Sequence, residues 1–230
     1  MEYQRHRTKT KDIAYSLYLY FLGLSYRNTA KVLHRFVHRS HVSIWKWMQK
    51  YKPQKVSSKR KKIEEFIIDE TQVKVGSQYI WLWVAIEPKH RQVLHIDISF
   101  ERNMLVAERF LSYLIDKYGK HHISTGGGTW YPQACKFLKI KHHTHSPFEK
   151  SIIEITMQYI KDRTESFDDY FPCRRKKYNL KQVKNWLKLF VDYNNNELNL
   201  KLTMRFLHFN ILYIVKLRNN VNLNLNKKTI

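Results

Sequence analysis

Two carboxylates in this sequence have positions that suit metal-assisted chemistry on a phosphodiester. Asp69 ends the apolar stretch FIIDE, where the alternation of a β-strand places it on the opposite face from Ile68. Glu154 lies in SIIEITMQYIKDRT, seven residues before Lys161 and nine before Arg163, so Glu154 and Lys161 share roughly one helical face. Carboxylate oxygens bind Mg²⁺, and nearby cations can contact the phosphates of flanking DNA.

The positive charge of the chain indicates the class of its partner. The 230 residues include 42 Lys and Arg against 19 Asp and Glu, a formal net charge of +23. Residues 1–62 contain 16 of these cations and only Glu2 and Asp12 as acids, which gives this segment +14. A surface this basic repels itself unless it meets a polyanion, so nucleic acid is the expected partner and an anionic membrane the rival.

The sequence predicts neither a membrane span nor a disulfide framework. Its apolar runs of about 12 residues are too short for a bilayer, which needs about 20. The two cysteines, Cys135 and Cys173, form no CxxC pair, which excludes a zinc ribbon. We therefore expect a cytoplasmic protein associated with the nucleoid.

Residues 1–52 have the pattern of a helix-turn-helix DNA-binding domain. Helical spacing over residues 12–22, 25–36 and 40–51 predicts three short helices. The third would enter the major groove and present polar side chains to phosphates and base edges. These side chains are Ser43, Lys46, Gln49 and Lys50. A three-helix bundle with a solvated basic face would have the same pattern.

From residue 63 the pattern changes to that of an α/β core, which we expect to extend over residues 63–200 after a basic linker at residues 53–62. Three strands are predicted in KIEEFIIDE, QYIWLWVAIE and QVLHIDISF. Helices and strands then alternate: a helix at 102–119, a strand at 121–125, a helix at 131–138, a strand at 139–145 and a helix from Pro147. Three antiparallel strands followed by alternating helices and strands predict a mixed sheet. Residues 180–193 are amphipathic and should pack on it, and residues 201–230 are expected to form a C-terminal helix and a frayed tail.

Together these segments resemble the DDE transposases of small prokaryotic insertion sequences. The resemblance covers roughly residues 12–195 and is strongest in DETQVKVG, GGTWYPQACKFL and IIEITMQYIKDRTESFDDYFP. It implies a ribonuclease-H-like core in which Asp, Asp and Glu bind two divalent metals, with Asp69 as the first Asp and Glu154 as the Glu. One metal would activate water or a DNA 3′-hydroxyl, and the other would stabilise the leaving oxygen.

The resemblance also implies the partners of the protein. The metal would be Mg²⁺ or Mn²⁺, and the DNA would be double-stranded terminal repeats and target DNA. A homodimer is implied because two DNA ends must be held, and no small-molecule substrate is expected.

The second Asp of the pattern should end the fourth strand, immediately before GGTWYP, and this position is Gly126. Glycine supplies no side-chain oxygen, so the resemblance implies an incomplete two-metal site and a transposase with impaired strand cleavage and transfer. The alternative to an impaired transposase is a non-catalytic DNA-binding remnant or inhibitor, and a third interpretation is a helix-turn-helix regulator with a ligand-sensing domain.

The run of three glycines that begins at Gly126 could instead cradle a phosphate, but the GxxxxGK[ST] pattern of phosphate-binding loops is absent.

Other candidate side chains have a structural interpretation beside the functional one. Trp130 could stack on a DNA base, but a core aromatic suits the same position. For Lys161 and Arg163 the alternative is a solvated helix face, and the resemblance favours DNA contact. Asp97 is conceivable as a replacement acid but is expected to be an edge charge, and alternation turns Glu70 to the opposite face from Asp69.

Histidines on two predicted strands raise the question of zinc. They are His121, His122, His143 and His145. Strand histidines near DNA are more often hydrogen-bonded or in contact with phosphate, and neither a cysteine nor a third placed ligand accompanies them. The sequence alone therefore does not favour a zinc site.

Overall fold

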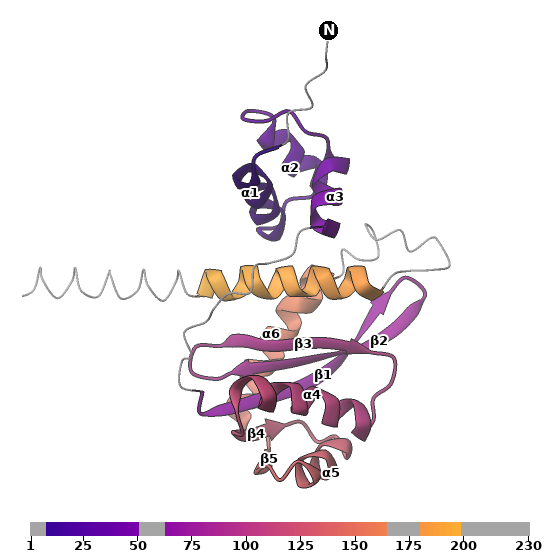
Figure 1. The fold of residues 1–230 in the computed structure, drawn as a ribbon, viewed down its shortest axis with the longest axis vertical. Helices are drawn as coiled ribbons and strands as arrows, with labels where there is room; N and C mark the ends of the chain where they lie inside the picture. Colours follow the sequence, from indigo (N-terminus) through magenta and orange to yellow (C-terminus); the bar gives the residue numbers. More distant parts are fainter. Residues whose placement is uncertain (1–7, 51–62, 165–179, 199–230) are drawn as a thin grey trace, which may run out of the picture.

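The computed structural model describes residues 8–50, 63–164 and 180–198, and its centre is a five-stranded sheet with helices on both faces (Figure 1). The strands are β1 (Glu65–Val75), β2 (Gln78–Glu87), β3 (Gln92–Ser99), β4 (His122–Thr125) and β5 (His142–Thr144). The helices of this core are α4 (Met104–Tyr118), α5 (Trp130–Phe137) and α6 (Pro147–Thr164), together with a helix over residues 180–198.

The strand order β3-β2-β1-β4-β5 confirms the predicted ribonuclease-H-like mixed sheet. Strands β1, β2 and β3 form an antiparallel meander, while β4 pairs parallel to β1 and β5 parallel to β4. One boundary differs from the prediction, because β1 continues through Val75 instead of ending at residue 70. The stretch after Asp69 keeps its pairing with β2 up to the turn at Gly76, whose φ of 62° suits glycine.

Alternation along β1 divides the core between the two faces of the sheet. Phe66 and Ile68 pack with the buried side chains of α4 and α5, whereas Ile67 packs with those of α6 and of the 180–198 helix. Asp69 has the parity of Ile67 and therefore belongs to the α6 face, while Glu70 belongs to the α5 face. This division decides which helix can place a side chain beside Asp69.

The N-terminal region folds as three helices, as the spacing predicts. They are α1 (Thr10–Phe21), α2 (Tyr26–Leu33) and α3 (His41–Lys50). The Ser25 hydroxyl caps α2 by accepting from the Asn28 N–H at 3.2 Å. In α3 the fully buried residues are Ile44 and Met48, whereas Val42 is 45% exposed. The role of these helices as a DNA-binding unit stays a prediction.

The helix over residues 180–198 lies between the three N-terminal helices and the sheet (Figure 1). Its apolar side chains Val183, Trp186, Leu187 and Phe190 are all at most 2% exposed, which confirms that this amphipathic segment packs on the core. The Trp186 indole N–H donates to the Tyr20 hydroxyl at 3.2 Å, and the Asn185 amide donates to the Met48 carbonyl at 3.1 Å. These two hydrogen bonds connect the 180–198 helix to α1 and to α3.

The far end of this helix contacts the edge strand β3. The Asn195 side-chain oxygen accepts from the Val93 N–H, and its amide donates to the Val93 carbonyl, both at 2.9 Å. This pair of bonds satisfies backbone groups that an edge strand otherwise leaves open.

Some predictions fall outside the described residues. These are the linker at residues 53–62, the tail at residues 201–230 and Cys173. Cys135 is buried and forms no disulfide within the described residues. None of the helices in the described ranges is long and apolar enough to cross a membrane.

Truncation of Phe190 tests whether the 180–198 helix is part of the core. Phe190 is 0% exposed and stacks on Trp186 at 5.4 Å between ring centroids, so Phe190→Ala should reduce the free energy of unfolding by about 3–5 kcal/mol. Phe137→Ala is the matched control, since this ring is 70% exposed and its loss should change stability by at most about 0.5 kcal/mol. Urea unfolding of both variants measures the difference. Equal losses would contradict the packing described above.

Candidate active site

Asp69 lies on β1 at the point where the pairing with β4 ends. The last pair of these two strands is Ile68 with Thr125, so the next residues along them are Asp69 and Gly126. Burial raises the pKa of Asp69 above its usual value and the charge of Glu154 adds to the rise, while a backbone hydrogen bond at Glu70 and the charge of Lys150 act in the opposite direction. A partly buried carboxylate with a raised pKa is a group that a bound cation would stabilise.

Gly126 is immediately beside the Asp69 carboxylate. A Cβ built on Gly126 would stand 3.0 Å from Asp69 Oδ1, so a side chain at this position would point at the same carboxylate. The two other glycines of the run differ from it. A Cβ on Gly127 would meet nothing within 4 Å, whereas one on Gly128 would stand 2.5 Å from the ring of Trp130. The ring of Trp130 therefore explains the glycine at position 128 without a bound phosphate.

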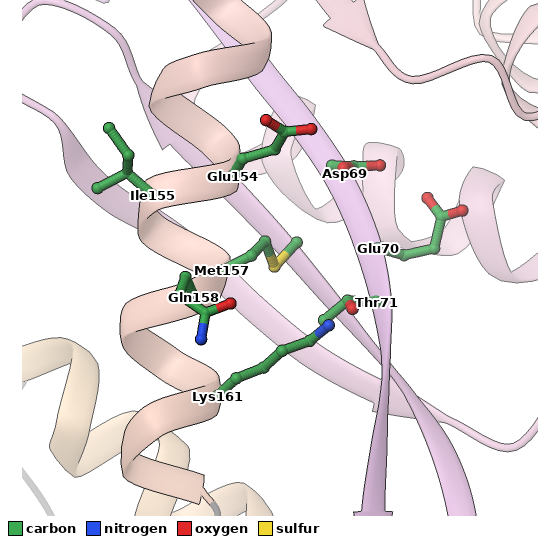
Figure 2. Close-up of a pocket in the computed structure, with 8 residues that line it drawn as sticks. All are labelled: Asp69, Glu70, Thr71, Glu154, Ile155, Met157, Gln158 and Lys161. Atoms are coloured by element: carbon green, nitrogen blue, oxygen red, sulfur yellow. The ribbon is translucent and has the colours of Figure 1, made fainter.

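Glu154 faces Asp69 from α6 across a pocket of about 490 Å³ (Figure 2). Its side chain is 60% exposed and lies 3.8 Å from the Lys150 ammonium, measured between Oε1 and Nζ. Lys161, two turns further along α6, lines the same pocket, as the helical spacing predicts. The side chain of Arg163 lies outside the described residues. The pocket is lined by Asp69, Glu70, Thr71, Glu154, Ile155, Met157, Gln158 and Lys161.

The side chains at this pocket fit one divalent cation better than two. Asp69 and Glu154 provide carboxylate oxygens, which Mg²⁺ and Mn²⁺ prefer, from two different elements. The backbone of Gly126 occupies the place from which a further carboxylate would reach the same ions. The residues present therefore do not fit the metal pair that the resemblance implies.

Glu70 belongs to a separate cluster on the α5 face. The Tyr131 hydroxyl donates to the Glu70 carboxylate, and the Arg102 guanidinium lies 3.7 Å from its other oxygen. The Glu70 side chain is only 5% exposed, and burial raises its pKa to about 7. Arg102 in turn stacks between Trp81 and Trp130, at 3.9 Å and 4.5 Å from the ring centroids. Sequence reasoning did not identify Tyr131 or Arg102, because no local spacing signals their contacts with β1.

The contacts of Glu70, Asp97 and Trp130 indicate a structural role for each of these side chains. Glu70 faces away from Glu154, as alternation predicts, and is held by its own partners. Asp97 on β3 forms an ion pair with Lys184 at 2.7 Å and does not line the Asp69 pocket. Trp130 packs against the core and Arg102, which favours a structural role for its ring.

The predicted DNA-binding side chains of α3 are not all presented in the same way. Lys46 and Lys50 are exposed, and Ser43 is half-buried with its hydroxyl 3.4 Å from that of Ser40. Gln49 differs from the prediction, because its side-chain oxygen is buried and has no hydrogen-bond partner among the residues that the structure describes. The reason is that the 180–198 helix packs against this end of α3, where Asn185 lies 3.4 Å from the Gln49 carbonyl.

Comparison with known proteins adds evidence that is independent of this geometry. Residues 63–191 match the family described as DDE domain. The chain is 32% identical to the uncharacterized protein MJ0017 of Methanocaldococcus jannaschii, over 77% of this chain and 82% of that protein. It is 26% identical to the transposase for insertion sequence element IS257 in transposon Tn4003 of Staphylococcus aureus, over 88% of this chain and 93% of that protein.

Solved structures with a similar chain path include the catalytic core domain of HTLV-2 integrase in complex with magnesium. The two chains are 19% identical with a TM-score of 0.40, over 54% of this chain and 82% of the integrase core.

The buried Glu70 makes the stability of the protein depend on pH in a defined direction. Its pKa is about 7 in the folded protein against 4.5 in the unfolded chain, so its protonated form stabilises the fold below pH 4.5. This stabilisation, about 3 kcal/mol, is lost as the pH rises through 7. Glu70→Gln keeps an acceptor for Tyr131 without the charge, and its stability relative to the parent should increase between pH 4.5 and 8.

Chemical unfolding across this pH range measures the effect. The exposed Glu64→Gln should follow the parent at every pH. A Glu70→Gln variant that also parallels the parent would contradict the buried position of this carboxylate.

Proposed function

Because the chain belongs to the DDE-domain transposases of insertion sequences, we propose that it binds the ends of a mobile DNA element and has impaired strand cleavage and transfer. The family assignment rests on the match over residues 63–191 and on the insertion-sequence transposase that is 26% identical over 88% of this chain. The observation that carries the proposal is the arrangement of Asp69 and Glu154 around one pocket, with Gly126 beside Asp69.

Each side chain of the pocket has a role in this proposal. Asp69 and Glu154 hold a divalent cation, Mg²⁺ or Mn²⁺, between β1 and α6. When bound, such a cation supplies positive charge to the phosphodiester and to the leaving oxygen. Lys161 lines the same pocket and contacts a phosphate of the DNA, and Arg163, two residues later in the sequence, is a second candidate for a phosphate contact.

The absence of a carboxylate at position 126 is the basis of the proposed impairment. Even the loss of an indirect partner of a metal ligand costs about 10–100-fold in metal affinity or activity, so loss of a direct ligand should cost more. The same observation favours a second candidate function, a non-catalytic DNA-binding protein that occupies element ends or inhibits an active copy. The two candidates differ only in whether measurable cleavage remains.

The N-terminal helices provide the proposed contact with double-stranded DNA. Lys46 and Lys50 are exposed on α3 and are the side chains best presented to phosphates, with Ser43 between them and the start of the helix. The charge of +14 in residues 1–62 supports binding of a polyanion at this end of the molecule. Handling of two element ends would require two copies of the chain, and this role would place the protein in the cytoplasm with the nucleoid.

Gly126→Asp should create the missing ligand. A Cβ at this position lies 3.0 Å from Asp69 Oδ1, so two carboxylates would repel each other without metal and share a cation with it. We expect the variant to have a lower Tm than the parent without metal, a larger rise in Tm on addition of Mn²⁺, and cleavage of terminal-repeat DNA at least about 100 times faster. Differential scanning fluorimetry and a cleavage assay on labelled DNA measure these effects.

Gly127→Asp is the matched control for this substitution. It adds the same charge one residue away, where a Cβ would meet nothing within 4 Å, and it should leave the metal response unchanged. Robust metal-dependent cleavage by the unmodified protein would refute the proposed impairment. An unchanged metal response in Gly126→Asp would refute the assignment of this position.

Substitution of the exposed lysines of α3 tests the DNA contact. Lys46→Ala and Lys50→Ala should each weaken binding of terminal-repeat DNA and reduce the slope of log K against log salt by about 1, because one phosphate contact is lost. Lys89→Ala removes an exposed lysine at the turn between β2 and β3 and should leave the slope unchanged. Gel-shift titrations over a salt series give the slopes. Equal slopes for all three variants would exclude α3 as the contact.

A further inference from the structure

Three side chains from three different elements meet away from the Asp69 pocket. Glu65 begins β1, His143 lies in β5, and Glu149 lies in the first turn of α6. His143 Nε2 is 3.0 Å from Glu149 Oε1 and 3.7 Å from Glu65 Oε1. All three possible ligand atoms lie within 4.8 Å of one another. The sequence pattern indicates the histidine, and Glu149 follows it by six residues, whereas Glu65 comes from a distant position on β1.

The spacing of these atoms suits a small divalent metal. Ligand atoms bound to Zn²⁺ at about 2.0–2.1 Å in a tetrahedron are separated from one another by about 3.3 Å. The two separations from His143 Nε2, 3.0 Å and 3.7 Å, lie on either side of this value. Small rotations of the Glu65 side chain, which is 24% exposed, would equalise them.

The charges of the cluster are unbalanced without a cation. The ion pairs that Glu65 and Glu149 form in the described part of the chain are both with His143, so one imidazole faces two carboxylates. Burial raises the pKa of Glu65, and the charge of Glu149 raises it further. A divalent cation would replace this repulsion by attraction to both carboxylates.

Glu149 is held in place by a second set of contacts. Its Oε2 accepts from the Ser146 N–H at 2.6 Å, and its own N–H donates to the Ser146 hydroxyl at 3.4 Å, which is a capping box at the start of α6. Burial acts to raise the pKa of Glu149, but the bonds from Ser146 and the contact with His143 outweigh it and lower the pKa to about 2. The carboxylate is therefore ionised and fixed, with Oε1 directed at His143.

We propose that Glu65, His143 and Glu149 form a structural metal site that binds Zn²⁺ and is separate from the Asp69 pocket. One imidazole with two carboxylates is a mixed nitrogen and oxygen donor set of the kind that zinc accepts, and water or the neighbouring exposed His122, whose ring centroid lies 5.0 Å from that of His143, completes it. Glu65 precedes Asp69 by four residues of β1, which separates the two sites by about 13 Å.

The metal would join the first turn of α6 to β1 and β5. Because Glu154 lies five residues after Glu149 on the same helix, fixing this turn also fixes the side chain that faces Asp69. The site therefore stabilises the fold and the geometry of the pocket without touching DNA.

Zinc binding to the full-length, metal-free protein tests the proposal. Titration of Zn²⁺ against a chromophoric competing chelator should show one tight equivalent per chain. Glu65→Gln and His143→Gln should each weaken this equivalent at least about 100-fold, because each removes a direct ligand. Glu64→Gln, an exposed neighbour, should not change it, and neither should the double variant Asp69→Asn with Glu154→Gln. The Tm of the parent should rise with Zn²⁺, and that of His143→Gln should not.

The outcomes separate the possibilities. If Glu65→Gln and His143→Gln bind Zn²⁺ as tightly as the parent, the cluster is only a helix cap with an ion pair and the proposal is overturned. It is also overturned if the tight equivalent disappears in the double variant at Asp69 and Glu154. Circular dichroism of the metal-free variants checks folding, and if His143→Gln is unfolded, Glu65→Gln decides, because Glu65 is outside the capping box.

Discussion

The candidate site depends on the parallel pairing of β4 with β1. This pairing ends at Ile68 and Thr125, and it sets position 126 beside Asp69 whatever residue stands there. The parity of β1 then decides that Asp69 faces α6 and that Glu70 faces α5. Two strands and one helix, brought together by strand pairing and hydrophobic packing, therefore determine where acid groups can meet, and burial at this place raises the pKa of Asp69.

The glycine run shows how one short segment can satisfy different constraints at neighbouring positions. Gly128 lies under the ring of Trp130 and leaves no room for a side chain, whereas Gly127 is open. Gly126 lies between these cases, because a side chain there would require a shift of only a few tenths of an ångström in the Asp69 carboxylate. The three positions therefore differ in how readily the backbone would accept a side chain.

Patterns of period 2 and 3.6 were sufficient to predict most of the core. The alternation around Asp69 separated it from Glu70, and the helical spacing of Glu154 and Lys161 placed both on the pocket side of α6. The predictions that differ from the structure concern residues whose surroundings come from distant segments. Gln49 is covered because the 180–198 helix packs on the end of α3. The cluster around His143 likewise needs the long-range pairing of β1, β4 and β5, which no local pattern encodes.

The bonds between Asn195 and Val93 have a consequence for assembly. An uncovered outer strand is a template on which a second chain can add a strand, in ordered dimers and in aggregates alike. Asn195 imitates such an incoming strand at Val93, since its amide supplies both the acceptor and the donor that a neighbour's backbone would offer. Continuation of the sheet into another molecule is thereby blocked at Val93, so a second chain could not add a strand to this part of β3.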